Sequence, residues 1–458
     1  MIRLAFYGDD FTGSTDALEV LAFAGLRCAL FLAPPTRESL EQIGELDAIG
    51  VAGDSRGMSP QEMDDRLTTV FQALAALKLP IVHYKVCSTF DSSPHIGSIG
   101  RALEIGKAAF GTVTVPIVAG TPGLGRYCLF GHLFARSGTD GKVYRIDRHP
   151  IMSAHPVTPM NESSLVDHLT RQATLGIEVF NYPNLEGDRA SIDAHWNDLA
   201  SRRPDAVLFD TASPRHLTEV GRLIESLARL SGPTFIVGSS GAEYALTQWW
   251  KESDEAQESP AAFATVSAAD KVLVISGSAS RLSSIQIDQA VEAGFVDVAI
   301  DSKELLDDTT WEVATDRIVT ASTEALQSGR SVILHTARGP EDPRIEQMIE
   351  SLIAKGQTRG QAKHEGGRVL GVRLGNITRK IVEAAQLKRL LLSGGDTSSQ
   401  ITQVLGPEAL VIAARLAPGA PLCRLISKHP SINGLEVALK GGQMGSQDFF
   451  VKALKGTV

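Results

Sequence analysis

The sequence predicts an α/β protein of two domains, each with a mostly parallel sheet flanked by helices. Three observations indicate this class. Short apolar runs alternate with longer segments of helical periodicity, and these short runs end in Gly, Asp or Ser. The chain has 458 residues, more than a single hydrophobic core normally organises.

The first half of the chain alternates regularly between the two patterns. A strand is predicted at 4–8, a helix at 15–26 and a second strand at 28–33. Further helices are predicted at 59–78 and 217–232, where apolar residues recur with helical spacing. The remaining buried strands of this half are predicted at 48–53, 81–86, 112–120, 206–210 and 234–240.

The pattern breaks at 248–271, where charged residues, Ser, Pro and Ala replace the apolar periodicity. Such composition is typical of an exposed linker or a long surface loop. We therefore expect a first domain at 1–250, a linker at 251–268 and a second domain at 269–458. The strand pattern resumes in the second domain at 271–280, 296–300, 331–337, 388–393 and 409–416.

Composition excludes several classes of function. The formal net charge is -9 and no basic block offsets it, which gives no support to nucleic-acid or anionic-membrane binding. The four cysteines are scattered without a CxxC pair, so neither a zinc knuckle nor a disulfide framework is indicated. The opening MIRLAFYG lacks the features of a signal peptide, and no apolar run reaches the length of a membrane span. We expect a soluble cytoplasmic protein, and a homodimer is left open.

The stretch GDDFTGSTD follows the first predicted strand and places Asp9, Asp10 and Asp16 close together. In a parallel α/β sheet, ligands bind beyond the carboxyl ends of the strands. Thr12 or Ser14 could cap the following helix, and the aspartates could be ordinary turn residues. Adjacent carboxylates repel unless something uses them, which favours hydroxyl binding, a general base or indirect contact with Mg2+.

Three more stretches of the first half place polar residues after predicted strands. Arg offers a planar fork for a carboxylate and Lys a point charge, so cations, hydroxyls and carboxylates on converging loops indicate a site for a polyhydroxylated acid. A fifth stretch, SAHPVTPMNESS, supplies His155, Thr158 and Asn161, of which the histidine is more often structural. The residues after the three strands are Arg56, then Lys85, Ser88, Thr89 and Asp91, then Arg126.

The second half contains three small-residue turns that precede helices. They lie in SGSASR, SGGDTSS and KGGQMG, and the first two directly follow apolar strands. Glycine permits close backbone approach, and a helix N-terminus aims N–H groups at phosphate. None of the three matches the P-loop or GxGxxG, but together they indicate a phosphate-binding surface.

An acid site in one domain and a phosphate surface in the other suggest phosphoryl transfer across an interdomain cleft. Such catalysis is largely positioning and charge neutralisation, with Mg2+ bridging phosphates and a carboxylate orienting the attacking hydroxyl. Asp10 is our hypothesis for the base, and Asp9, which ends the strand, is expected to bind hydroxyls. No side chain is assigned as a direct metal ligand.

At these residues the sequence resembles the four-carbon acid sugar kinase family over nearly the whole chain. The resemblance rests on GDDFTGSTD, where the family usually shows ADDxTGAxD, and on KVCSTFDSSPHIGSIG, the Gly-Arg of PGLGR, the SGS turn, SGGDTS and LKGGQMGSQDFF. It implies an ATP-dependent kinase of the terminal hydroxyl of a short sugar acid, such as 3-oxo-tetronate, threonate or erythronate. It also implies that the first domain binds the acid and the second the nucleotide.

The resemblance and the strand-end pattern together define the candidate site. The STFDSS segment is closer to the 3-oxo-tetronate branch than to the threonate branch, which tends to read DSTLRG. Gly8 and the segment SSPHIGSIG depart from the family pattern, so a branched acid such as 3-oxo-isoapionate is an alternative acceptor. The substrate candidates are Asp9, Thr12, Asp16, Arg56, Lys85, Ser88, Thr89, Asp91 and Arg126, and the ATP candidates are Ser276, Ser278, Gly394, Gly395, Asp396, Thr397, Gly441, Gly442 and Gly445.

Two other classes of function are weighed against the kinase. An NAD-dependent dehydrogenase would need GxGxxG on a strand-turn-helix unit, and no convincing instance is present. A non-catalytic sugar-acid-binding protein would keep the first-half cluster but would have no reason for SGGDTSS and KGGQMG.

Overall fold

A computed structural model of the chain describes residues 2–138, 140–155, 157–253, 263, 265–417 and 419–457. The chain divides into two compact units, Met1–Ala261 and Ala262–Val458. Each unit contains a mostly parallel sheet flanked by helices, which confirms the predicted fold class. The predicted linker, 251–268, lies partly outside the described residues, at 254–262 and 264, and its extent stays a prediction.

The first unit is built on a parallel sheet with the strand order β2-β3-β1-β4-β11-β5-β10-β9. The central strands β1 and β4 pair in register, so that Gly8 lies beside Lys85 at their carboxyl ends. The strands are β1 (Leu4–Gly8), β2 (Cys28–Phe31), β3 (Ala48–Ala52), β4 (Ile81–Lys85), β5 (Val115–Val118), β9 (Ile177–Phe180), β10 (Ala206–Phe209) and β11 (Thr234–Gly238).

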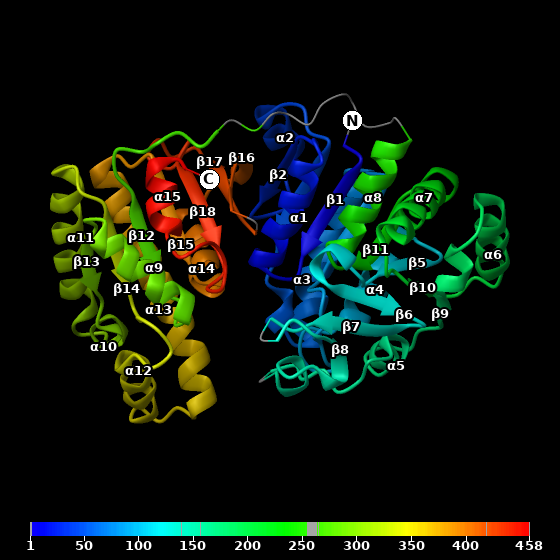
Figure 1. Cartoon of the computed structure of the whole chain (residues 1–458), viewed down its shortest axis with the longest axis horizontal. Coiled ribbons are helices and arrows are strands. Elements are labelled where there is room, and N and C mark those ends of the chain that lie inside the picture. Colours follow the sequence, from blue (N-terminus) through cyan, green and yellow to red (C-terminus); the bar gives the residue numbers. More distant parts are fainter. Residues whose placement is uncertain are drawn as a thin grey trace. The chain divides into compact units, whose positions relative to one another are not determined.

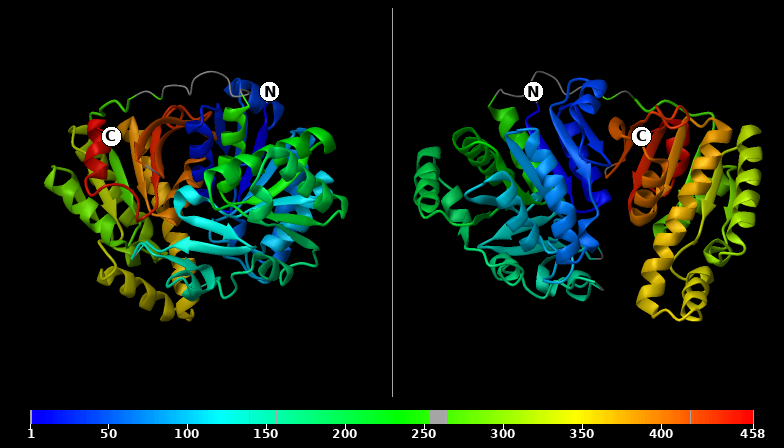
Figure 2. Two further views of the ribbon diagram at one scale, coloured as in Figure 1. Left: turned by 45° about the vertical axis from the view of Figure 1, so that its right-hand side comes forward. Right: turned by 180° about the vertical axis from the view of Figure 1, so that it is seen from behind.

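Helices cover both faces of this sheet, with α1, α7 and α8 packed together on one face and α3 and α4 on the other (Figures 1 and 2). Local sequence sets their starts: α3 begins with a capping box between Ser59 and Glu62, and Pro60 occupies its first turn. The helices are α1 (Phe11–Phe23), α2 (Arg37–Ile43), α3 (Pro60–Ala76), α4 (Ile99–Phe110), α5 (Leu165–Thr170), α6 (Arg189–Ser201), α7 (Pro214–Ser231) and α8 (Gly241–Glu252).

A small antiparallel sheet of β6 (Arg126–Leu129), β7 (His132–Arg136) and β8 (Val143–Arg145) was not expected from the sequence. Leu129 pairs with His132, and the two residues between them, Phe130 and Gly131, have φ of 50° and 72°. These values fit a type I′ hairpin turn, whose twist suits two antiparallel strands. The stretch around Arg126, which we expected to be a loop after the strand predicted at 112–120, is therefore partly a hairpin.

The second unit has the strand order β13-β14-β12-β15-β18-β17-β16. The first five strands of this order run parallel, whereas β17 runs antiparallel to both β18 and β16. The predictions include β16 but miss β17 and β18. The strands are β12 (Leu273–Ser276), β13 (Val296–Ala299), β14 (Val332–His335), β15 (Arg389–Ser393), β16 (Ala409–Ala417), β17 (Ala420–Ile426) and β18 (Glu436–Lys440).

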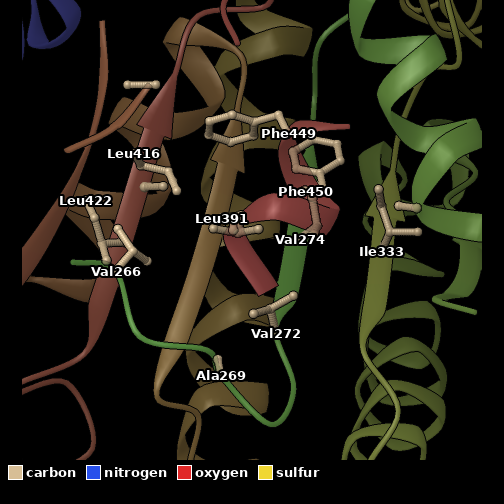
Figure 3. Close-up of a cluster of buried hydrophobic side chains, with 14 of the residues drawn as sticks. Val266, Ala269, Val272, Val274, Ile333, Leu391, Leu416, Leu422, Phe449 and Phe450 are labelled. Atoms are coloured by element: carbon tan, nitrogen blue, oxygen red, sulfur yellow. The ribbon is translucent and has the colours of Figure 1, made fainter. Parts of the chain in front are cut away.

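Helices again cover two faces, with α9 and α15 on one and α11, α13 and α14 on the other (Figures 1 and 2). Figure 3 shows Phe449 and Phe450 of α15 packed in the same buried cluster as Leu391 of β15 and Val274 of β12. This packing fixes the chain after β18. The helices are α9 (Arg281–Glu292), α10 (Ser302–Leu306), α11 (Trp311–Gln327), α12 (Pro343–Ile353), α13 (Arg359–Ala385), α14 (Gly395–Leu405) and α15 (Phe449–Lys455).

Candidate active site

The link between β1 and α1 consists of Asp9 and Asp10. Asp10 has extended backbone angles and is the N-cap of α1, because its Oδ1 accepts a hydrogen bond from the Gly13 N–H at 2.7 Å. The expectation that Thr12 or Ser14 caps this helix is wrong, because the helix begins before both. Ser14 Oγ instead donates to the Asp10 carbonyl at 2.7 Å, and Thr12 is exposed on the first turn.

Arg56 joins the two adjacent carboxylates. Its Nη2 donates to Asp9 Oδ1 at 2.9 Å, its Nε donates to Asp9 Oδ2 at 3.1 Å, and its Nη1 lies 2.8 Å from Asp10 Oδ2. The backbone N–H of Arg56 also donates to the Asp9 carbonyl at 3.0 Å. One guanidinium therefore offsets the repulsion that makes the tandem aspartates unusual.

Asp9 is the buried member of this group, with 5% of its surface exposed. Burial raises the pKa of its carboxyl to about 6, and the Arg56 guanidinium limits the rise. Because both Asp9 oxygens accept hydrogen bonds from Arg56, the main contact of this carboxylate is with the arginine. The expectation that Asp9 binds substrate hydroxyls stays a prediction.

Lys85 ends β4 and brings a buried cation to the same loops. Its Nζ lies 3.4 Å from Asp16 Oδ2, and its carbonyl accepts the Asp9 N–H at 2.8 Å. Burial lowers the pKa of Lys85, but Asp16 and Asp10 outweigh burial and hold the pKa above its usual value. A Cβ at position 13 would lie 2.9 Å from Lys85 Nζ, so Gly13 leaves the space that the lysine occupies.

A second polar network follows β4. Thr89 Oγ1 donates to Asp91 Oδ1 at 2.5 Å, and Thr158 Oγ1 donates to Asp91 Oδ2 at 3.3 Å. His155 Nδ1 lies 3.1 Å from Thr158 Oγ1. His155, which the sequence suggested to be structural, is therefore linked to the Asp91 carboxylate through Thr158. Ser88 is half-buried on the same loop.

Cys87 is a residue of this loop that sequence reasoning missed. Its Sγ lies 3.0 Å from Thr89 Oγ1, the hydroxyl that donates to Asp91. Burial and then Asp91 raise the pKa of the Cys87 thiol, while Arg56 opposes them. The thiol therefore lies within electrostatic reach of both polar networks, and the signal for it was its place inside KVCSTFDSS.

Arg126 begins β6 and is not joined to the Asp9 network by a direct contact. Its Nη1 donates to the carbonyls of Leu124 and Arg136 at 3.1 and 3.2 Å. Burial lowers the pKa of Arg126, and Cys87 acts in the opposite direction. Its buried Nε has no hydrogen-bond partner among the described residues, which leaves one donor for a ligand.

In the second unit the three small-residue turns converge, because β12, β15 and β18 are neighbours in the sheet. The Gly277 N–H donates to the Ser393 carbonyl, and the Gly394 N–H donates to the Lys440 carbonyl, both at 3.0 Å. The third turn also directly follows a strand, β18, whereas the sequence placed only two of them there.

At two of these positions a Cβ would force a neighbouring hydroxyl to move. A Cβ on Gly277 would lie 2.0 Å from Thr397 Oγ1, and a Cβ on Gly442 would lie 2.3 Å from Ser278 Oγ. The backbone of one turn thus packs directly against a side chain of another turn, Gly277 against Thr397 and Gly442 against Ser278. Gly394, Gly395, Asp396 and Thr397 open α14, while Gly441, Gly442 and Gly445 form the third turn.

Helix N-termini and hydroxyls complete this edge of the sheet. Helix α9 is capped by Ser280, and Asp396 is exposed in the first turn of α14. Ser276 is 1% exposed, and its Oγ has no hydrogen-bond partner among the described residues. Backbone N–H groups and hydroxyls at such a position suit the oxygens of phosphate groups.

No group of three or more His, Cys, Asp or Glu side chains in the described ranges could hold a metal ion. No helix in those ranges has both the length and the apolar character needed to cross a membrane.

Comparisons with known proteins follow the same division of the chain. Residues 4–246 match a family described as a sugar-binding N-terminal domain, and residues 273–450 match one described as a nucleotide-binding C-terminal domain. A 3-oxo-isoapionate kinase from Paraburkholderia graminis is 43% identical over 99% of this chain and 94% of its own length. A 3-oxo-tetronate kinase from Cupriavidus necator is 28% identical over 99% of this chain and 96% of its own length.

Solved structures share the fold. A protein from Salmonella typhimurium LT2 has a TM-score of 0.78 at 22% identity, with 99% of both chains covered. A protein from Haemophilus influenzae has a TM-score of 0.73 at 20% identity, with 99% of this chain and 100% of that chain covered.

Proposed function

The chain belongs to the sugar-acid kinase family that joins a sugar-binding N-terminal domain to a nucleotide-binding C-terminal domain, and on this premise we propose that it transfers the γ-phosphoryl group of ATP to a terminal hydroxyl of a short sugar acid. The observation that carries the proposal is the 43% identity to a named kinase over 99% of the chain. The polar groups at the strand ends of each unit supply the chemistry that such a transfer needs.

We propose 3-oxo-isoapionate, the branched alternative from the sequence, as the first acceptor to test. The kinase named for this acid is 43% identical to the chain, whereas a kinase named for 3-oxo-tetronate is 28% identical. The four-carbon acids 3-oxo-tetronate, threonate and erythronate follow as the second group. We propose that the departures from the family pattern at Gly8 and in SSPHIGSIG contribute to this preference.

In the acceptor site, Arg56 and Lys85 provide the positive charges that attract the carboxylate of the sugar acid. Asp10 receives the proton of the attacking hydroxyl, since its side chain is about a third exposed while the Asp9 carboxylate is buried against Arg56. Asp9 holds Arg56 in place. Thr12, Asp16, Ser88, Thr89, Asp91 and Arg126 are the groups that we propose for the remaining hydroxyl and carboxylate oxygens.

In the donor site, N–H groups of the three turns bind phosphate oxygens, except those of Gly277 and Gly394, which already donate to carbonyls of neighbouring strands. The hydroxyls of Ser276, Ser278 and Thr397 are further donors to the same oxygens. The residues present fit a Mg2+ ion that arrives with ATP, because such an ion keeps several waters and needs few protein ligands. The exposed carboxylate of Asp396 is suited to hold it through water. When bound, Mg2+ neutralises the charge that develops on the phosphates.

The proposal requires both units, because the acceptor site lies in the first and the donor site in the second. Catalysis then consists mainly of positioning the hydroxyl against the γ-phosphorus, with Asp10 removing the proton. The shared cleft that the sequence predicts for this step stays a prediction. A cytoplasmic location is proposed as well, since the four cysteines are scattered without a CxxC pair and ATP is the phosphoryl donor.

The test is ADP release by the purified chain with a panel of sugar acids, with and without Mg2+. We expect turnover with 3-oxo-isoapionate that exceeds turnover with 3-oxo-tetronate, threonate and erythronate, and loss of turnover when EDTA removes Mg2+. Tight binding of an acid without nucleotide binding or turnover would instead favour a sugar-acid-binding protein. Sedimentation of the same sample would decide whether the chain is a homodimer.

A further inference from the structure

Lys440 is a buried cation at the end of β18, immediately before the third turn. It is 2% exposed, and its Nζ donates to Ser393 Oγ at 2.9 Å. The ring centroids of Phe449 and Phe450 lie 5.9 and 5.8 Å from Nζ. Within the part of the chain that the structure describes, no carboxylate lies at ion-pair distance from this ammonium group.

An ammonium group in this environment is costly to keep charged. Burial lowers the pKa of Lys440 to about 8, and no nearby charge acts on it in the opposite direction. Buried charges in proteins are normally paired, and the aromatic rings replace only part of the lost hydration. A negatively charged ligand would supply the missing partner.

The neighbours of Lys440 indicate where such a ligand binds. Ser276 pairs in register with Ser393, and Ser393 pairs in register with Lys440, so the three side chains form a row on one face of the sheet. Ser276 Oγ is buried and has no hydrogen-bond partner among the described residues. The row thus holds one unsatisfied hydroxyl and one unpaired ammonium group.

This row lies beside the three turns. Ser283 Oγ of α9 is 3.3 Å from Ser393 Oγ and donates to the Gly442 carbonyl at 3.1 Å. Gly441 and Gly442 directly follow Lys440 in the chain, and the Gly394 N–H binds its carbonyl. A phosphate held by the turn N–H groups is therefore close to the ammonium group.

We propose that Lys440 is the counter-charge for the phosphates of the bound nucleotide, with the Ser276 hydroxyl as a second donor to the same anion. The inference rests on the proposed function, because the anion is the polyphosphate of ATP or ADP. The competing explanation is structural: Lys440 could serve only to hold α15 through Phe449, Phe450 and the Ser393 hydroxyl.

The experiment compares Lys440→Met with Lys452→Met, the same change on a half-buried lysine of α15 that pairs with Asp448. Calorimetry measures the binding of ADP, inorganic tripolyphosphate and adenosine by the wild-type chain and both variants. For Lys440→Met we expect binding of ADP and tripolyphosphate to weaken about 10- to 100-fold, with adenosine binding unchanged. Lys452→Met should bind all three as the wild type does.

A pH series on the wild-type chain tests the inference without any substitution. ADP affinity should fall as the pH rises through about 8, because the ammonium group loses its proton there. Equal ADP binding by wild type and Lys440→Met, or a flat pH series in the wild type, would overturn the inference and leave the kinase proposal standing. A wild-type chain that binds neither ADP nor tripolyphosphate would overturn both.

Discussion

The guanidinium of Arg56 binds both carboxylate oxygens of Asp9, through Nη2 at 2.9 Å and Nε at 3.1 Å, and its third nitrogen reaches Asp10. Two residues that are 47 positions apart thus form a planar fork at the ends of neighbouring strands β1 and β3. Only arginine has this geometry. The bidentate contact fixes the orientation of the Arg56 guanidinium, and with it the orientation in which Arg56 would contact a substrate.

Replacing Arg56 by Lys should therefore weaken acceptor use although the charge is kept. A lysine cannot make the bidentate contact, so we expect KM for the sugar acid to rise about 10- to 100-fold. KM for ATP should change little, because the donor site lies in the other unit. Steady-state kinetics with each substrate varied separately measures both. An equal rise in both constants would contradict the assignment of Arg56 to the acceptor site.

Asp10→Asn separates catalysis from capping. Asparagine caps helices as well as aspartate does, so the free energy of unfolding should hardly change. If Asp10 is the base, kcat should fall about 10²- to 10⁴-fold with ATP binding intact. Asp188→Asn is the matched control, since Asp188 caps α6 in the same way through Ser191. Retention of kcat in Asp10→Asn would remove Asp10 as the base.

Asp9 predicts an acidic limb in the pH profile. Its pKa is raised to about 6, so below this pH the protonated carboxyl no longer pairs with Arg56 as an anion. We expect kcat/KM for the sugar acid to decline below about pH 6 in the wild type, and this limb to be absent from the residual activity of Asp9→Asn. If the wild type and Asp9→Asn show the same decline of kcat/KM at low pH, the decline does not come from Asp9.

The same pKa makes a prediction about stability. Since the folded pKa, about 6, exceeds the usual value of 3.8, the folded state binds this proton more tightly than the unfolded state does. The stabilisation is complete below pH 3.8 and is lost as the pH rises through about 6. Relative to Asp9→Asn, the wild type should lose free energy of unfolding across this window. Denaturant unfolding at several pH values measures the difference.

Gly8 and Ser14 form a compensating pair. A Cβ at position 8 would lie 2.0 Å from Ser14 Oγ, the hydroxyl that donates to the Asp10 carbonyl. Both positions are usually Ala in the family that the sequence resembles. We expect Gly8→Ala to destabilise the fold by about 1–3 kcal/mol through overpacking, and Ser14→Ala to cost about 1 kcal/mol.

The double variant Gly8→Ala, Ser14→Ala should be more stable than Gly8→Ala alone, because the methyl group then occupies the space of the hydroxyl. Thermal unfolding of the four chains gives the coupling free energy. Additive effects of the two substitutions would show that the pair is not compensating.

The sequence predicted the location of the polar clusters because parallel strands end at one edge of a sheet. Polar residues that follow β1, β3 and β4 therefore had to be neighbours, although Arg56 and Lys85 are far from Asp9 along the chain. The same reasoning brought the turns after β12 and β15 together. This prediction did not need the full strand order, because the polar residues follow strands in the centre of each sheet.

Features that depend on tertiary contacts were not predictable in this way. The hairpin of β6 and β7 consists of short, half-buried strands, whose apolar signal is weak. The link from His155 through Thr158 to Asp91 joins segments 64 to 67 positions apart that share no strand. The sequence showed that Lys440 precedes a turn. It did not show that Lys440 is buried without a carboxylate partner among the described residues, because that depends on how the strands and α15 pack.

Phosphorus NMR of the complete reaction tests the central claim most directly. With ATP, Mg2+ and 3-oxo-isoapionate, we predict that the γ-phosphate signal is replaced by a phosphomonoester signal that couples to protons of the terminal carbon. The ester should form in equal amount to ADP. Release of inorganic phosphate alone, or an unchanged ATP spectrum with every acid of the panel, would contradict the claim that this chain joins a phosphoryl group to a sugar acid.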